Sequence, residues 1–562
     1  MAIASINFYQ EYNFKVLCSL NGHGFSGTLI FGKGGTPHLN LNGYSKELVT
    51  ALEEIDLNNS ITCKDEESGV NLVMHRSVVS GQTVFSDYVS LGNSDDGFDK
   101  IEILYTGMST WCERINPFEI DGDVLKCNIS IDNFDEFFVF RNNTYSIAND
   151  QRINITNENS MKTSIITEHT ITLKKDGGVF ELDEAKDLIH EVRNLFSLLM
   201  GVAISIETIH TYMSVSPGKF KRLYFPTVLH SLTPLEQRHY SLASFNEIHN
   251  DEFWNVIFSN YFLKDTFREI WNRLPTSFDY KGIWEYQILS RAIVLEKYAG
   301  AIAKGGKKKM ISPTFSALKE NLKKSLEGFE ANATFKENDS EVFSSIKKYV
   351  LDVGNTSMQT LQDKYDYLMG TLSDDIREIL SFSEDDFKLI KQLRNDTAHG
   401  NEYINHSGTN DITHEMMISD RLLILLMCFA YLDLGFSEKQ ILSFISNSFC
   451  SLLRNANINK RALDKFNDDA KFIKISPCVD DSLLKNAIYL AIAYNKQTGV
   501  YSFDEGLSDK IKSALLNGKL KDLIAFIKET IDYECNIEVL NKVYINNGDV
   551  ELLYHAVVLI TL

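Results

Sequence analysis

The spacing of apolar residues changes once along this chain, and the change limits the folds open to it. From residue 1 to about 180, short apolar stretches alternate with turn residues. Residues 27–31 (GTLIF) lead through the glycine-rich segment 32–37 into the alternating 38–41 (HLNL). Alternation with a period of two predicts strands with one buried face. Several such strands at fairly regular spacing favour an antiparallel sandwich or barrel.

A helical period replaces the alternation after residue 180. From Asp183 to Met200 the apolar residues recur at the i, i+3, i+4, i+7 spacing of a helix lying on a core, and Gly201 follows. The sequence also predicts a helix over 284–302, a helical stretch over 350–380 and a helix over 412–434 that is almost wholly apolar after Arg421.

Between these helices, Ser383 and the acidic residues after it predict another helix start, because Ser caps free N–H groups and acidic groups suit the positive end of the helix dipole. Gly400 suits the end of that helix.

A chain of 562 residues exceeds a single hydrophobic core. We predict an α+β multidomain protein. A β-rich domain over 1–225 precedes a helical connector over 226–280 and a helical bundle over 281–450. A helical C-terminal extension, including a helix near Leu483–Tyr494, covers 451–562.

The net charge is −20, from 56 Lys and Arg against 76 Asp and Glu. Phosphate backbones bind basic surfaces, so any RNA contact must use a local patch or cleft. The densest basic cluster is Lys304, Lys307, Lys308 and Lys309, which either steers RNA or is a charged loop tip.

We expect a cytoplasmic protein without a membrane span. The first ten residues lack the pattern of a signal peptide, and the most apolar run, Leu422–Leu432, is roughly half as long as a bilayer core requires. The eight cysteines show no C-x2-C pair, which is typical of reduced, scattered thiols. The glycine-rich segment 32–37 lacks the spacing of a phosphate loop.

The candidate chemistry lies in residues 394–399 (RNDTAH) at the end of the helix that Ser383 opens. Histidine is the residue type suited to proton transfer near neutral pH, so His399 is a candidate to take the 2′-OH proton of RNA or to protonate the leaving oxygen. Arg394 stays charged and offers a fork of donors to a phosphate on which negative charge builds. Because RNA supplies its own nucleophile, we expect no metal and no cofactor.

Geometry limits how this pair meets. Residues five apart on a regular helix point about 140° apart, whereas Asn395 and His399 share a face. Arg394 and His399 converge if the helix ends between them, if the Arg side chain wraps round, or if two chains share a cleft. We favour the shared cleft. The structural alternative is that Arg394 and His399 only complement the helix end.

RN-x3-H at the end of a bundle helix resembles the HEPN ribonuclease superfamily, and the chain as a whole resembles the ApeA-type anti-phage defence proteins. The likeness lies in residues 27–32 (GTLIFG), 38–43 (HLNLNG), 292–296 (AIVLE) and 394–399, and it covers roughly residues 1–440. The resemblance implies a β-rich N-terminal domain and a C-terminal HEPN domain.

It also implies a ribonuclease that arrests the infected cell, dimerises or forms a higher homo-oligomer through the HEPN bundle, and stays silent until a phage-derived trigger acts; tRNA is one candidate substrate. The alternatives are a non-catalytic HEPN module that binds RNA or a protein partner, with the β-domain as ligand sensor, and a lectin-like binder with a helical scaffold.

Several supporting residues have open roles. Asn395 either holds the His or the phosphate, or caps a backbone group. Glu296 either pairs with Arg394 and orients it, or is a solvated helix charge. His406 is a candidate for the mouth of the same site. His414-Glu415 lacks the second His of a zinc protease helix.

Overall fold

The computed structural model divides the chain into two compact units, Met1–Ser373 with Phe382–Ala456 and Asp374–Ser381 with Asn457–Leu562. The side chains of 118–121, 124–127, 153–159, 162–166 and 250 are not described. The structure describes the rest of the chain except residues 1–5, 21, 44, 54–59, 93–96, 113–117, 122–123, 128–132, 160–161, 215–219, 231–239, 251, 281, 304–309, 337, 356–359, 402–410, 519 and 532–534.

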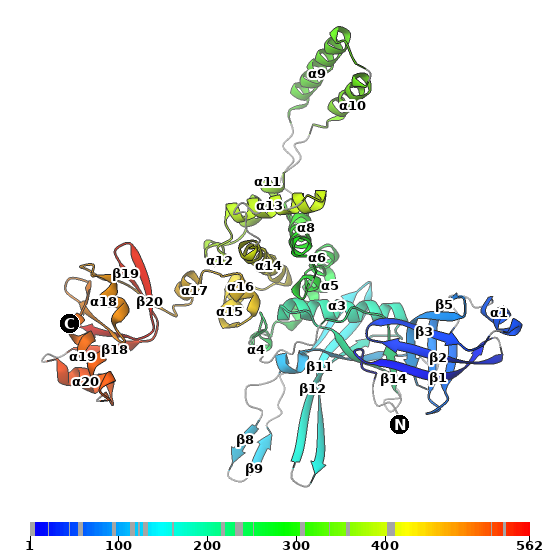
Figure 1. The fold of residues 1–562 in the computed structure, drawn as a ribbon, viewed down its shortest axis with the longest axis horizontal. Helices are drawn as coiled ribbons and strands as arrows, with labels where there is room; N and C mark the ends of the chain where they lie inside the picture. The colour runs from blue at the N-terminus through cyan, green and yellow to red at the C-terminus, as the bar shows by residue number, and fades with distance from the viewer. Residues whose placement is uncertain are drawn as a thin grey trace. The chain divides into compact units, whose positions relative to one another are not determined.

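The first unit begins with a closed antiparallel barrel of six strands (Figure 1). Each strand alternates buried and exposed residues, so apolar side chains such as Val16, Leu29, Leu39 and Met74 fill the interior. β6 closes the barrel because it pairs with β3 on one edge and β5 on the other. The strands are β1 (Glu11–Leu20), β2 (His23–Gly32), β3 (Gly35–Leu41), β4 (Ile61–Asp65), β5 (Asn71–Ser80) and β6 (Thr83–Leu91), with α1 (Lys46–Glu53) after β3. The predicted sandwich or barrel is therefore a barrel.

β6 also pairs with β14, which extends the sheet beyond the barrel in the order β14-β13-β7-β12-β11-β10. These strands are β7 (Lys100–Tyr105), β10 (Asp135–Phe140), β11 (Asn143–Asn159), β12 (Lys162–Lys175), β13 (Ile206–Tyr212) and β14 (Phe220–Tyr224). α2 (Met108–Cys112) and the two-stranded pair β8 (Phe118–Asp121) and β9 (Val124–Cys127) lie between β7 and β10 in the chain.

α3 (Leu182–Met200) carries the predicted apolar stripe, which is buried from Ala185 to Met200. Gly201 ends the helix at φ 68°, a left-handed conformation that glycine adopts without strain. The Tyr105 hydroxyl donates to the Ile189 carbonyl at 2.7 Å and ties α3 to β7. The Tyr431 hydroxyl donates to the Leu199 carbonyl at 2.9 Å, which fixes the helical half of the unit to the end of α3.

The helical half is built around α14 (Thr413–Leu434), which is buried almost all round from Leu422 to Tyr431. α8 (Trp284–Ile302) packs on α11 (Leu361–Met369), α13 (Glu384–His399) and α14. The other helices are α4 (Phe245–Asn250), α5 (Trp254–Leu263), α6 (Asp265–Trp271), α7 (Pro275–Phe278), α15 (Glu438–Asn447) and α16 (Ser451–Asn455). α8 and α14 match the predicted helices.

The predicted stretch 350–380 is three helices, because α10 (Asp339–Asp352) ends near its start and α11 and α12 (Asp374–Leu380) follow separately. α10 pairs with α9 (Ser312–Asn332) in a hairpin held by ring contacts of Phe329 and Phe335 with Phe343. Neither helix contains a buried residue. None of the helices in the described part of the chain has the length and apolarity of a membrane span.

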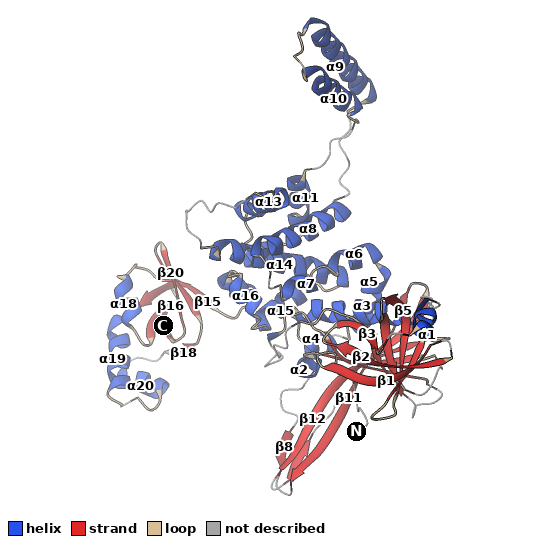
Figure 2. Ribbon diagram, turned by 45° about the vertical axis from the view of Figure 1, so that its right-hand side comes forward, coloured by secondary structure: helices blue, strands red, loops and turns tan. Residues whose placement is uncertain are grey.

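The second unit contains helices and strands (Figure 2). Its helices are α12, α17 (Lys460–Phe466), α18 (Asp481–Asn486), α19 (Glu505–Leu516) and α20 (Leu523–Thr530). The strands form two sheets, β15-β19-β20 and β17-β16-β21-β18. They are β15 (Lys471–Lys474), β16 (Leu490–Asn495), β17 (Val500–Phe503), β18 (Asn536–Leu540), β19 (Val543–Asn547), β20 (Val550–Tyr554) and β21 (Val557–Thr561).

The prediction of a helical C-terminal extension is thus incomplete, and the helix predicted near Leu483–Tyr494 is wrong in its second half. β16 and β21 are parallel neighbours with mostly buried side chains. Such strands form continuous apolar runs that periodicity does not separate from a buried helix.

Candidate functional site

α13 positions the motif 394–399 on an unbroken helix. The Ser383 Oγ accepts the Asp386 N–H at 3.1 Å, and the Asp386 side chain accepts the Ser383 N–H at 2.9 Å, which completes a capping box. Gly400 ends the helix at φ 70°. The predicted cap and stop are confirmed, and the helix continues through His399. It therefore does not end between Arg394 and His399, which removes one of the three ways in which the pair could converge.

Arg394 is turned toward α8. Its guanidinium donates to Glu296 Oε2 at 2.7 Å and to Asn395 Oδ1 at 3.0 Å. Glu296 thus forms the ion pair that the sequence left open, although its role in orienting the Arg stays a prediction. The Arg394 side chain is 33% exposed, so part of its five-donor fork still faces solvent.

His399 lies at the last helical position, with an exposed side chain. Asn395, one turn earlier and partly buried, shares its face of the helix. On this regular helix Arg394 and His399 are separated by about 140° of rotation. One chain therefore presents the Arg toward α8 and the His on a different side of α13.

Other candidate residues are outside the described part of the chain. Lys304, Lys307, Lys308 and Lys309 belong to 304–309, and His406 belongs to 402–410. Their predicted part in RNA binding stays a prediction. Within the described residues, no group of three or more His, Cys, Asp and Glu has an arrangement that could hold a metal ion.

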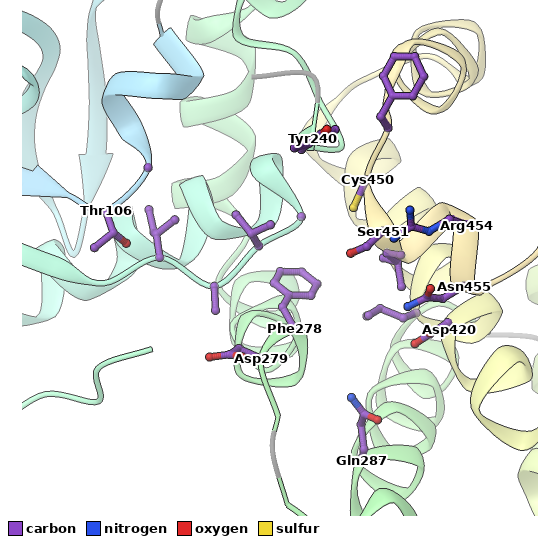
Figure 3. Close-up of a pocket in the computed structure, with 18 of the residues that line it drawn as sticks. Thr106, Tyr240, Phe278, Asp279, Gln287, Asp420, Cys450, Ser451, Arg454 and Asn455 are labelled. Atoms are coloured by element: carbon purple, nitrogen blue, oxygen red, sulfur yellow. The ribbon is translucent and has the colours of Figure 1, made fainter. Parts of the chain in front are cut away.

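A separate cavity of about 800 Å³ lies elsewhere in the first unit and was not predicted (Figure 3). Its walls come from the β7–α2 turn, the segment after α3, the α7 end, α8, α14 and α16, none of which includes the motif. Because segments far apart in the sequence form the cavity, no local sequence pattern predicts it. It is lined by Thr106, Gly107, Thr110, Gly201, Val202, Ala203, Ile204, Glu207, Tyr240, Phe278, Asp279, Gln287, Arg291, Met416, Asp420, Leu423, Phe449, Cys450, Ser451, Leu452, Arg454 and Asn455.

A buried ion pair lies in one wall of this cavity. Arg291, on α8 and 2% exposed, donates to Asp420 Oδ1 at 2.9 Å and to Ser419 Oγ at 2.7 Å. Burial raises the pKa of Asp420, and the neighbouring Arg291 opposes that shift. Burial, with a smaller contribution from the nearby Glu168 charge, raises the pKa of Glu207 on another wall. Glu207 and Asp420 are therefore protonated more readily than carboxylates in water.

The fold and the motif together define a class: a β-rich domain followed by a HEPN-type helical bundle with RN-x3-H at the end of a bundle helix. Family comparison agrees. Residues 15–273 match the ApeA N-terminal domain 1, and residues 289–440 match the ApeA-like HEPN domain. The two matches cover most of the chain, which is an ApeA-type protein with a HEPN domain. No curated protein and no solved structure gives a significant match.

Proposed function

We propose that this chain is an endoribonuclease of anti-phage defence, which cuts RNA with Arg394, His399 and Asn395 once a trigger releases it. The HEPN family points to RNA cleavage or RNA binding in defence. The observation that carries the catalytic proposal is α13 itself. A guanidinium anchored by Glu296 and a solvent-exposed imidazole lie five residues apart on one capped helix of a HEPN domain.

The proposed reaction needs only these groups and the RNA. His399 takes the proton of the 2′-OH as its oxygen attacks phosphorus. The bond from phosphorus to the 5′-oxygen breaks, the protonated imidazole of His399 returns its proton to that oxygen, and the products are a 2′,3′-cyclic phosphate and a 5′-hydroxyl. Arg394 stabilises the negative charge that builds on the phosphate oxygens. Asn395, on the face of His399, is placed to hold the imidazole or the phosphate.

The shared cleft remains our interpretation of how the pair meets. Because α13 is regular through His399, Arg394 and His399 of one chain point in different directions, and a second copy would supply the missing partner to each. The active species is then a homodimer with two composite sites.

Mixing two inactive variants tests this interpretation. Arg394→Ala and His399→Ala should each lose RNA cleavage by about 10²–10⁴-fold. In a mixed dimer, one composite site keeps both wild-type residues. A co-refolded equal mixture should therefore recover about a quarter of wild-type activity, since half of the dimers are mixed and each has one intact site. No recovery would contradict the shared cleft and leave a site within one chain.

The same variants separate catalysis from binding. If His399→Ala cleaves RNA and protects cells from phage as wild type does, the chain is a non-catalytic HEPN module, the alternative function. Cleavage should persist in EDTA. If cleavage vanished there and returned with magnesium, the metal-free reaction would be wrong. Intact tRNA in phage-infected cells that are nonetheless protected would exclude tRNA as the substrate.

A further inference from the structure

The cavity of the first unit has the size of a small-molecule site. Its volume, about 800 Å³, falls within the range of ligand pockets, roughly 300–1,000 Å³. Both parts of the unit contribute to it: Thr106 and Gly201 come from the β-rich part, and Gln287 and Asp420 come from α8 and α14. It is separate from the motif on α13.

Three aromatic side chains line the cavity. Phe278 points its ring into the space, and Tyr240 lies across from it at the rim (Figure 3). Phe449, 70% exposed, adds a third ring to the lining. Partly exposed rings around a cavity can stack on a planar ligand, and base–aromatic stacking tolerates different bases.

The rest of the lining offers hydrogen bonds of both kinds. The buried Arg291 keeps a donor without a partner among the described residues, its Nε. This Nε has almost no solvent-accessible surface, so a ligand acceptor would reach it only after neighbouring side chains move, and would then satisfy a buried donor. Arg454, Ser451 and Asn455 lie together on the α16 wall, and Asp279 lies on the other side of the space at the α7 end (Figure 3).

The charges of the lining residues restrict the chemical class of ligand that the cavity can bind. Three carboxylates, Glu207, Asp279 and Asp420, face two guanidiniums, Arg291 and Arg454, and Arg291 is already paired with Asp420. This balance disfavours a polyphosphate. It suits a molecule that both gives N–H groups to carboxylates and offers oxygen acceptors to guanidiniums.

We propose that this cavity binds a nucleoside-class ligand, a planar base carrying a sugar with at most one phosphate. The ligand would rest on Phe278 and direct its acceptors to Arg291 and Arg454. Its effect would pass along α8, because Arg291 is five residues before Glu296, which holds Arg394. The coupling to RNA cleavage rests on the proposed function, whereas the binding does not.

Calorimetry on the full chain tests the binding. The probes are adenosine, guanosine, cytidine and uridine, and their 5′-monophosphates. At least one should bind, with affinity lowered about tenfold or more in Phe278→Ala and in Arg454→Gln. Phe267→Ala and Arg273→Gln, which make the same changes outside the cavity, should bind as wild type does. Phe278→Leu keeps the apolar side chain and provides a better folded variant without the ring.

The relative affinities of the eight probes distinguish the possible outcomes. Tighter binding of monophosphates would place the phosphate at Arg291 and Arg454, and tighter binding of nucleosides would show that the carboxylates dominate. Either supports the proposal. Absence of binding by all eight probes, or equal binding by Phe278→Ala, Arg454→Gln and their controls, would overturn it. Binding without any change in RNA cleavage would retain the site and reject only the coupling.

Discussion

The end of α13 and the cavity between α8, α14 and the β-rich part present their polar groups in opposite ways. On α13, His399 is exposed, Arg394 is turned away from it, and neither lines the cavity. In the cavity, one chain brings Arg291, Asp420 and Phe278 together from three segments. We therefore expect RNA cleavage to require two chains, whereas a single chain should contain the whole ligand-binding cavity.

Dilution should produce the largest effect. If two chains share the cleft, as we propose, each chain alone has half of the composite site, and RNA cleavage per chain should fall toward zero below the dissociation constant of the dimer. Nucleoside binding per chain should stay constant over the same range. Cleavage rates and calorimetry, alongside mass photometry of the oligomeric state, measure both. Full RNA cleavage by a monomer would contradict the shared cleft.

The sequence predicts the parts of this fold that local pattern determines. α8 and α14 follow from apolar spacing, and α13 follows from Ser383 and Gly400, where backbone geometry requires those residue types. β16 was missed because a parallel strand with both faces covered lacks alternation. α9 was not predicted, although its larger apolar residues recur at helical spacing, and none of them is buried: Phe315, Leu318, Leu322, Leu326 and Phe329.

The candidate site divides in the same way. The motif on α13 could be predicted because its residues are adjacent in sequence, and the Glu296 pairing could be suggested through the α8 resemblance. The cavity could not, because its lining comes from positions between Thr106 and Asn455 that only the fold brings together. The domain boundaries at 225, 280 and 450 and the catalytic roles remain proposals.

Removing Arg291 should destabilise the first unit more than any surface substitution. Arg291→Met leaves Asp420 buried without its cation, and breaking a buried ion pair from one side costs about 3–5 kcal/mol. Adding Asp420→Asn should restore part of the loss, because the isolated charge is gone. All four tryptophans, Trp111, Trp254, Trp271 and Trp284, belong to this unit, so their fluorescence during urea unfolding measures it. An unchanged midpoint would contradict the buried pair.

α14 also carries Asp433, whose carboxylate accepts hydrogen bonds from the neutral Trp271 and Tyr298, with the Lys264 charge nearby. Trp271 Nε1 donates to it at 2.9 Å, and burial raises its pKa to about 6. A raised folded-state pKa means that its stabilisation is complete below the unfolded value, near pH 4, and is lost as the pH rises through about 6.

Asp433→Asn should remove this loss. The difference in unfolding free energy between the Asp433→Asn variant and the wild type should rise by on the order of 2 kcal/mol, in favour of the variant, between pH 4 and pH 7. The tryptophan fluorescence of urea unfolding at each pH measures the difference. A difference that is constant with pH would show that Asp433 titrates normally.

Glu296→Gln should affect only the motif. The guanidinium of Arg394 loses its anionic anchor but keeps Asn395, so we expect kcat for RNA to fall about tenfold with little change in KM. Glu384→Gln is the matched control, because it makes the same change in an exposed ion pair, the one with Lys388 on α13. Nucleoside binding should be unchanged in both. Equal kcat values in the two variants would show that Glu296 does not orient Arg394 for cleavage.

The smallest effect should come from the start of α13. Ser383→Ala removes the Oγ that accepts the Asp386 N–H and should lower the stability of the first unit by about 1 kcal/mol. Ser437→Ala, in the equivalent capping box of α15, should cost a similar amount. Hydrogen exchange should rise in the first turn of α13 only for Ser383→Ala, with kcat unchanged in both, because fraying is confined to the end turn. A fall in kcat for Ser383→Ala alone would show that the whole helix moves as one body, and that the motif is sensitive to changes four turns away.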